Sequence, residues 1–319
     1  MQYVIYDTNE YVRMVGDSNK PFNQIEESVA RLHNCEQRLS LVPILNTTVA
    51  FELIKHLASN DPNELNLYIR ACYALAIHCR PSFPIMTKNP IASYIENEFQ
   101  KQLVSIDYLI KFLQEMINNP TPQTIAANSK LIERVDNYLY NVGINYLADL
   151  QRLRPQFQTQ DDQRKWMLQI VNTKDYLQYR ATSFLESLVV ACREVDSRKV
   201  ITANTLRKFV QEHPTYIEIW REFDKKYIEG GYNLQKLKTA NTFWDAEICY
   251  HLGTTVNNHK VYIVTEENML HRAAKKAHQS NWMLKINQVH TFNKIRFYFR
   301  NFLALIQKPW WTIIRTQKN

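Results

Sequence analysis

The chain has 319 residues, of which 45% are hydrophobic, so it can bury one large core or two smaller ones. No apolar run approaches the ~20 residues of a membrane-spanning helix, and no basic region followed by a long apolar stretch opens the sequence, so we expect a cytoplasmic protein without a membrane segment. Five scattered cysteines (Cys35, Cys72, Cys79, Cys192 and Cys249) have no metal-ligand spacing and are expected to be buried, reduced thiols. The formal net charge is +8.

The first predicted element is a strand at the very start of the chain. Tyr3-Val4-Ile5-Tyr6 are strand-forming residues, and Asp7-Thr8-Asn9 after them favours a stop and a turn. Asp7 is therefore expected at the carboxyl end of the first strand. In an open parallel sheet, ligands bind at that edge.

A helix, a strand and a second helix are predicted next. The spacing of apolar residues predicts a helix over 23–38, and residues 39–45 form a strand candidate that Pro43 weakens, because proline removes a ladder donor. Asn46-Thr47-Thr48 then predicts the cap of a helix from Val49 to about Ser59. Glu52 lies in the early turns of this helix.

From about residue 64 to 237 the sequence predicts helices and almost no strand, with no repeat at a fixed period. The α/β pattern resumes at 241–251, a predicted helix that contains Asp245. Residues 260–264 predict a buried strand that ends at Thr265-Glu266-Glu267, followed by a helix to 277 and a strand candidate over 282–286.

The predicted fold is therefore α/β and helix-dominated in total, with one parallel sheet between helices. The sheet domain is discontinuous, formed by 1–60 and 240–290, and a large all-helical insertion over 61–239 interrupts it; 291–319 is a basic, aromatic C-terminal tail. Each acid alone could merely end a strand or start a helix. Together, Asp7, Glu52, Asp245 and Glu267 should converge on one edge of the sheet, where clustered carboxylates are tolerated if a cation neutralises them.

These stretches resemble the PIN-domain nucleases, which include toxin ribonucleases of the VapC type. Residues 3–9 are similar to the opening strand and Asp-x-Asn of the family, and 49–53 to its helix with the second acid. Residues 241–248 are similar to the third-acid helix, and 261–268 to the last acidic strand end, with Glu at 267 where Asp is commoner. The resemblance covers a little over a third of the chain.

The resemblance implies a PIN-like fold and a metal-dependent endoribonuclease. Asp7, Glu52, Asp245 and Glu267 would bind Mg²⁺ or Mn²⁺, while Asn9 and Thr265 would orient carboxylates or the scissile phosphate. Such nucleases often act as toxins or defence effectors held by an inhibitory or regulatory protein, and self-association is a further option. A DNA nuclease of the flap type and a catalytically inactive RNA-binding or scaffold protein stay open as alternatives.

The C-terminal charge supports an anionic partner. Residues 268–319 hold ten of the 39 Lys and Arg residues and no acid, so this segment carries the whole positive surplus. We expect Lys294, Arg296 and Arg300 to contact the RNA backbone, although a solubilising surface would give the same pattern. Arg207 and His213 match the Arg-x4-6-His spacing of the HEPN ribonucleases, which we interpret as a coincidence of composition.

Overall fold

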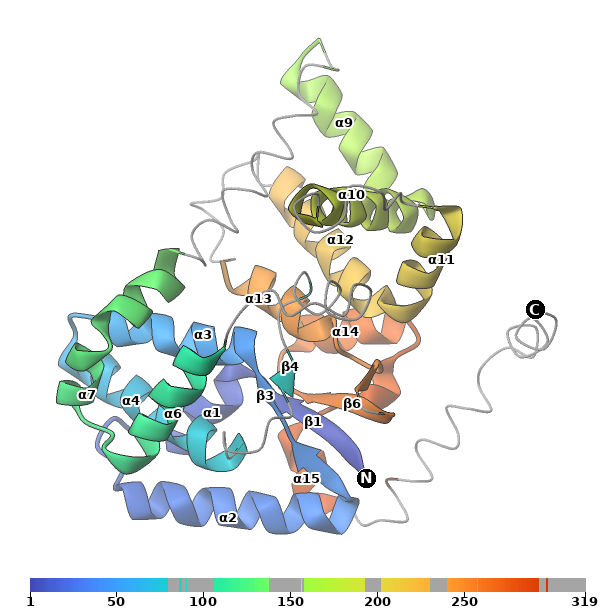
Figure 1. The fold of residues 1–319 in the computed structure, drawn as a ribbon. Coiled ribbons are helices and arrows are strands. Elements are labelled where there is room, and N and C mark those ends of the chain that lie inside the picture. Colours follow the sequence, from blue (N-terminus) through green and yellow to red (C-terminus); the bar gives the residue numbers. More distant parts are fainter. Residues whose placement is uncertain are drawn as a thin grey trace.

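The structure is a computed structural model, and it describes residues 1–79, 86–87, 90, 106–137, 156, 158–192, 202–229, 240–256, 258–292 and 297. The chain folds as α/β with a small sheet and many helices (Figure 1). The strands of the main sheet are β1 Gln2–Tyr6, β2 Leu41–Pro43, β5 Thr255–Val256, β6 His259–Val264 and β7 Met283–Leu284; β3 Leu45–Asn46 pairs separately with β4 Met86–Thr87.

The described helices lie before, between and after these strands. In chain order they are α1 Thr8–Val15, α2 Phe22–Leu39, α3 Thr47–Lys55, α4 Pro62–Cys79, α6 Asp107–Asn118, α7 Pro122–Ala127, α9 Gln160–Val171, α10 Asp175–Cys192, α11 Ala203–Glu212, α12 Pro214–Glu229, α13 Ala240–Cys249, α14 Asn268–Lys276 and α15 Ile286–Thr291. Short 3₁₀ turns follow α3 at His56–Ala58 and precede β7 at Ser280–Trp282.

The sheet joins the two ends of the described chain. β1 pairs in parallel with β2 on one side and with β6 on the other, β7 pairs in parallel with β6, and the short β5 pairs antiparallel with β6. The β1–β6 register runs from Tyr3 opposite Val261 to Tyr6 opposite Val264, and these strands are almost fully buried. The predicted α/β class, helix-dominated and with a mostly parallel sheet, is confirmed, and both central strands end at the same edge.

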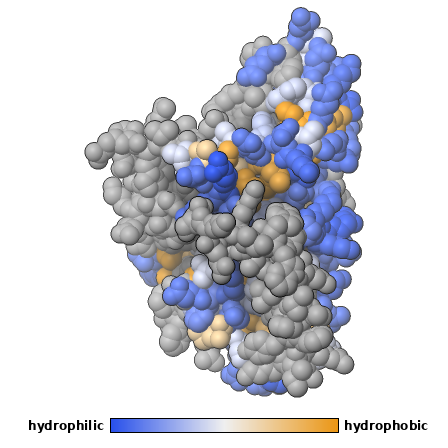
Figure 2. All heavy atoms as spheres, turned by 90° about the vertical axis from the view of Figure 1, so that its right-hand side faces the viewer, coloured by the Kyte–Doolittle hydropathy of each residue, from blue (hydrophilic) through white to orange (hydrophobic). Residues whose placement is uncertain are grey.

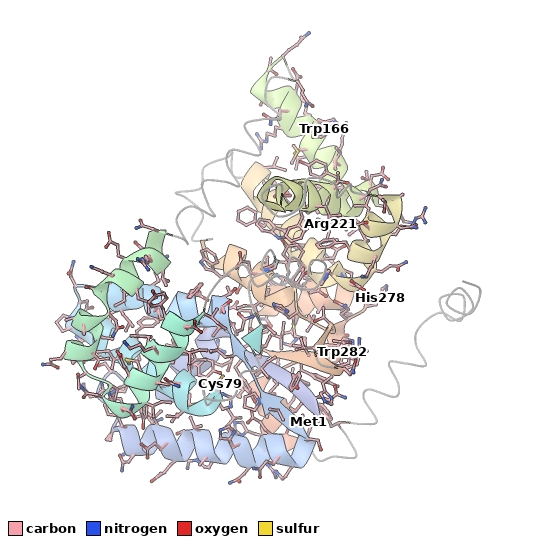
Figure 3. All side chains as sticks on the ribbon, in the orientation of Figure 1. Met1, Cys79, Trp166, Arg221, His278 and Trp282 are labelled. Carbon is pink, nitrogen blue, oxygen red and sulfur yellow. The ribbon has the colours of Figure 1, made fainter. Side chains whose placement is uncertain are left out.

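The described helices of range 61–239 form two groups (Figure 1). α4 packs against α1, α2 and α3, and α6 packs on α4, whereas α9–α12 pack on one another and, through α12, on α13 and α14. Figure 3 labels Cys79, at the end of α4, in the first group and Trp166, on α9, in the second.

Two local expectations need correction. Thr8 begins α1 directly, with Asp7 at the N-cap position, so the predicted stop after β1 is a helix start. The strand expected over 39–45 is two short strands, β2 and β3, which belong to different sheets. The helix expected over 241–251 is observed as α13 Ala240–Cys249, and it contains Asp245.

No helix among the described residues is long and apolar enough to cross a membrane. On the face shown in Figure 2, hydrophilic side chains predominate among the described residues, and the hydrophobic ones form small separate areas. Cys35, Cys72, Cys79 and Cys249 are buried free thiols, as expected.

Candidate active site

The four predicted acids come from four separate elements. Asp7 follows β1, Glu52 lies on α3, Asp245 lies on α13, and Glu267 stands between β6 and α14. Asp7 and Glu52 are buried, whereas Asp245 and Glu267 are partly exposed. α3 packs against α13, which brings Glu52 toward Asp245. β1 packs against β6, which brings Asp7 toward Glu267.

Hydroxyl and amide groups hold three of the carboxylates. Thr265 Oγ1 donates a hydrogen bond to Asp7 Oδ2 over 2.9 Å, and the same oxygen accepts one from the backbone N–H of Glu267 over 3.1 Å. Thr8 Oγ1 donates to Glu52 Oε2 over 2.5 Å. Asn9 Nδ2 donates to Glu267 Oε1 over 3.3 Å. The structure thus places Asn9 and Thr265 as groups that orient carboxylates.

The electrostatics show that the acids act on one another. Burial raises the pKa of Asp7 to about 6; hydrogen bonds from Thr265 and Thr8 oppose that rise, and the charge of Glu267 adds to it. Burial also raises the pKa of Glu52 to about 8, and the Asp7 charge contributes. The pKa of Asp245 is well above its usual range because of burial and the charges of Asp7, Glu52 and Glu267. Each of the four carboxylates therefore lies close enough to at least one other for their negative charges to repel.

An oxygen-only set of this kind suits Mg²⁺ or Mn²⁺. These ions prefer carboxylate and water ligands, and a bound cation would offset both the burial and the repulsion that raise the pKa values of Asp7, Glu52 and Asp245. Among the described residues, no three of these acids offer oxygens that all lie within 4.8 Å of one another.

Two polar groups near the site are not identified from the sequence. The Asp-Thr-Asn pattern predicts Thr8 as a turn residue. In the structure Thr8 instead donates a hydrogen bond to Glu52, which lies 44 residues later in the sequence. Glu10 is buried, pairs with Arg13 over 2.8 Å and accepts the backbone N–H of Glu266 over 3.2 Å. Burial raises the pKa of Glu10 to about 7, although the Arg13 charge opposes this. An acid three residues after Asp7, on the first turn of α1, is the signal in the sequence that could have found it.

A partly buried pair also links the helices that carry Glu52 and Asp245. Thr48 Oγ1, at the start of α3, donates to Glu247 Oε2 on α13 over 3.0 Å. Burial raises the pKa of Glu247 to about 7, and the Thr48 hydrogen bond lowers it. Glu247 lies two residues after Asp245, so this bond sets how α13 meets α3 and thereby where Asp245 stands.

The Arg207 and His213 pair has a structural explanation. His213 is buried, stacks on Tyr250 with ring centroids 3.9 Å apart, and donates from Nδ1 to the Tyr250 carbonyl over 2.8 Å. Burial lowers the pKa of His213 to about 3. Arg207 is exposed and bonds to Asn204 one turn earlier on α11. This geometry favours the interpretation as coincidence.

The predicted RNA-contacting residues Lys294, Arg296 and Arg300 lie outside the described residues, as does nearly all of 293–319. Within the described part of the basic segment, Arg272 and Lys275 are exposed on α14, Lys276 pairs with Glu222, and Lys285 pairs with Glu266 over 3.4 Å. Some of the C-terminal charge is thus neutralised by acids of the protein itself.

No family model, curated protein or solved structure matches this chain. Its function must therefore be inferred from its own residues and their geometry.

Proposed function

We propose that the chain is a metal-dependent endoribonuclease with a PIN-like fold. The observation that carries the proposal is the meeting of Asp7, Glu52, Asp245 and Glu267 at the carboxyl edge of two neighbouring parallel strands. Ligands bind at this edge in open α/β sheets, and acids buried against one another at the cost of raised pKa values are typical of functional sites.

The four acids would hold one or two Mg²⁺ or Mn²⁺ ions. When bound, such ions polarise a phosphoryl oxygen and make a water molecule more acidic. The protein's own part is positioning: Thr265 orients Asp7, Thr8 orients Glu52, and Asn9 orients Glu267. Thr265 is fully buried, and Thr8 nearly so, so these donors are fixed before substrate arrives.

RNA as the substrate rests on the resemblance to the PIN-domain nucleases and on the basic C-terminal segment. Lys and Arg bind the phosphate backbone of any nucleic acid, so charge alone favours neither RNA nor DNA. A role as a toxin or defence effector, with an inhibitory protein partner, follows from the same resemblance.

One assay tests the proposal against its two rivals. Labelled single-stranded RNA, structured RNA and flap-type DNA are incubated with the purified chain in Mn²⁺, in Mg²⁺ and in excess EDTA. RNA cleavage that needs the ion and disappears in Asp7→Asn supports the proposal. Cleavage of DNA alone would make the chain a flap-type nuclease, and RNA binding without cleavage would make it a binding or scaffold protein.

A further inference from the structure

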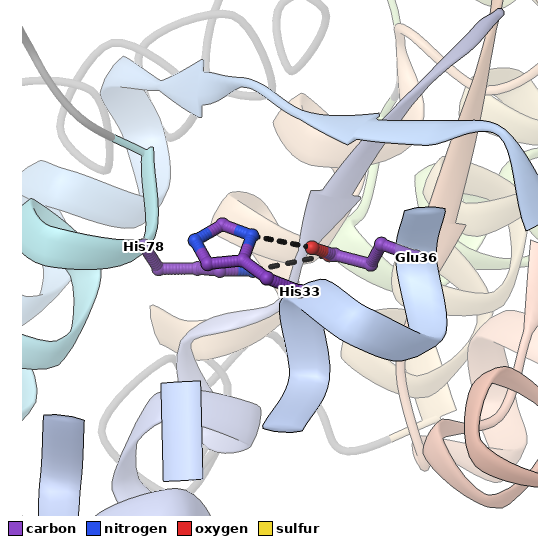
Figure 4. A group of neighbouring side chains, drawn as sticks. All are labelled: His33, Glu36 and His78. Carbon is purple, nitrogen blue, oxygen red and sulfur yellow. Dashed lines mark hydrogen bonds and ion pairs between the residues drawn. The ribbon is translucent and has the colours of Figure 1, made fainter. Parts of the chain in front are cut away.

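A second group of metal-ligand side chains lies between α2 and α4 (Figure 4). His33 Nδ1 stands 2.9 Å from Glu36 Oε2, and His78 Nε2 stands 3.0 Å from Glu36 Oε1. The ligand atoms of all three residues lie within 4.8 Å of one another, the only such group among the described residues. None of them belongs to the acid site at the sheet edge.

His78 is held in place by a residue outside the group. The Nδ1 atom of His78 shares a 3.0 Å hydrogen bond with the Tyr11 hydroxyl, which leaves Nε2 facing Glu36. His78 and Glu36 are almost fully buried, while His33 keeps 23% of its side chain exposed. Metal-binding imidazoles are oriented in this way by a partner on the second ring nitrogen, and the exposed edge of His33 gives an ion a way in.

Polar atoms around the group are left without partners. His33 Nε2 and the fully buried Tyr6 hydroxyl make no hydrogen bond of standard length. The Tyr6 ring packs against the His78 ring, with ring centroids 4.9 Å apart. Unsatisfied buried polar atoms are uncommon, and an unfilled ligand position is one explanation for them.

We propose that His33, Glu36 and His78 form a binding site for a divalent transition-metal ion of the zinc class. Zinc ligands at about 2.0–2.1 Å in a tetrahedron stand about 3.3 Å apart, close to the two His–Glu separations here. Two imidazoles and one carboxylate also favour zinc over Mg²⁺, which prefers oxygen alone. The ion would tie α2 to α4 beside β1, with Tyr6 or water at a fourth position.

The test measures Zn²⁺ binding to the full chain after EDTA treatment and dialysis. Asp7→Asn is used as the background, so that binding at the acid site is weakened. We expect one equivalent of Zn²⁺ per chain, with affinity falling at least about 10-fold in both His33→Asn and Glu36→Gln. The matched control is His56→Asn, because His56 also pairs with a glutamate, Glu64, over 3.1 Å but belongs to no three-ligand group in the described chain.

Co²⁺ provides a second measurement of the same site. Bound by two imidazoles in low coordination, it should give visible absorption bands that disappear in His33→Asn. Since His33 is partly exposed, this variant should keep the fold, which circular dichroism checks. Absence of Zn²⁺ binding in the Asp7→Asn protein, or equal affinity in folded His33→Asn, would mean that hydrogen bonds alone hold the three residues.

Discussion

Thr265 reaches across the β1–β6 pair and donates a hydrogen bond to Asp7, with 2.9 Å between Oγ1 and Oδ2. The residue that follows one strand therefore fixes the acid that follows its neighbour. Because the same hydroxyl accepts the backbone N–H of Glu267, a single buried side chain ties together two of the four acids. The positions of Asp7 and Glu267 relative to each other therefore depend on this hydroxyl.

Replacing Asp7 by Asn should abolish cleavage and leave the fold intact. Asparagine keeps the shape and can still accept the Thr265 hydrogen bond, but it removes the charge that would bind the proposed ion. Because Asp7 is buried beside other acids, its neutralisation should also raise the melting temperature of the metal-free protein. Cleavage assays and thermal unfolding in EDTA measure the two effects.

The control for this change is Asp136→Asn, at an exposed acid on the surface of the described chain. It should alter neither activity nor melting temperature. A well-folded Asp7→Asn protein that cleaves at the wild-type rate would remove Asp7 from the active site.

Thr265→Val should weaken the binding of Mn²⁺ by about 10- to 100-fold, because the variant keeps the volume of the side chain but loses the hydroxyl that orients Asp7. It also leaves the Glu267 N–H without its acceptor, so some stability is lost, about 1–3 kcal/mol. Thr265→Ser restores the hydroxyl and should recover most of the affinity. Titration calorimetry with Mn²⁺ compares the three proteins; equal affinities in Val and Ser variants would show that the hydroxyl has no positioning role.

Replacing Lys294, Arg296 and Arg300 together by Ala should weaken RNA binding and flatten its salt dependence. Each phosphate contact by Lys or Arg releases counterions, so losing three contacts lowers the slope of log affinity against log salt by about 2–3. Single-turnover cleavage at saturating RNA should change little, because no metal ligand is altered. An unchanged salt slope would mean that these three basic side chains do not contact RNA. The C-terminal segment would then serve mainly to dock aromatic residues such as Phe297, which packs on Tyr262.

The sequence predicts the position of Asp7 and Glu267 well because both follow buried strands whose β-branched and aromatic residues give a clear pattern. Asn46 likewise predicts the start of α3, and its side chain does accept the Val49 N–H there. Such signals are local, so no tertiary contact is needed to read them.

Other features depend on contacts between distant segments. The Thr8–Glu52 bond and the Thr48–Glu247 bond join residues far apart in the chain, and neither has a local signature. The same holds for His78, which meets His33 and Glu36 only when α4 packs on α2. The short β7 gives too few residues for a period to be recognised, and its pairing with β6 defines it.

His213 should make the stability of the protein fall in mild acid. Burial lowers its pKa to about 3, well below the ~6.5 of an unfolded chain. Between these two values the unfolded state binds a proton that the native state does not, so stability decreases as the pH falls below about 6.5. From pH 7 to pH 5 the burial of this residue should lower the free energy of unfolding by about 2 kcal/mol.

His213→Gln can still donate to the Tyr250 carbonyl but does not titrate. Denaturant unfolding should therefore show that the free energy of unfolding of this variant falls by about 2 kcal/mol less between pH 7 and pH 5. Arg207→Ala is the control, since Arg207 is exposed on the neighbouring helix and should leave the pH profile unchanged. Neither variant should slow RNA cleavage. Parallel pH profiles for wild type and His213→Gln would contradict the burial argument, and loss of cleavage in both variants would move the active site from the sheet edge to α11.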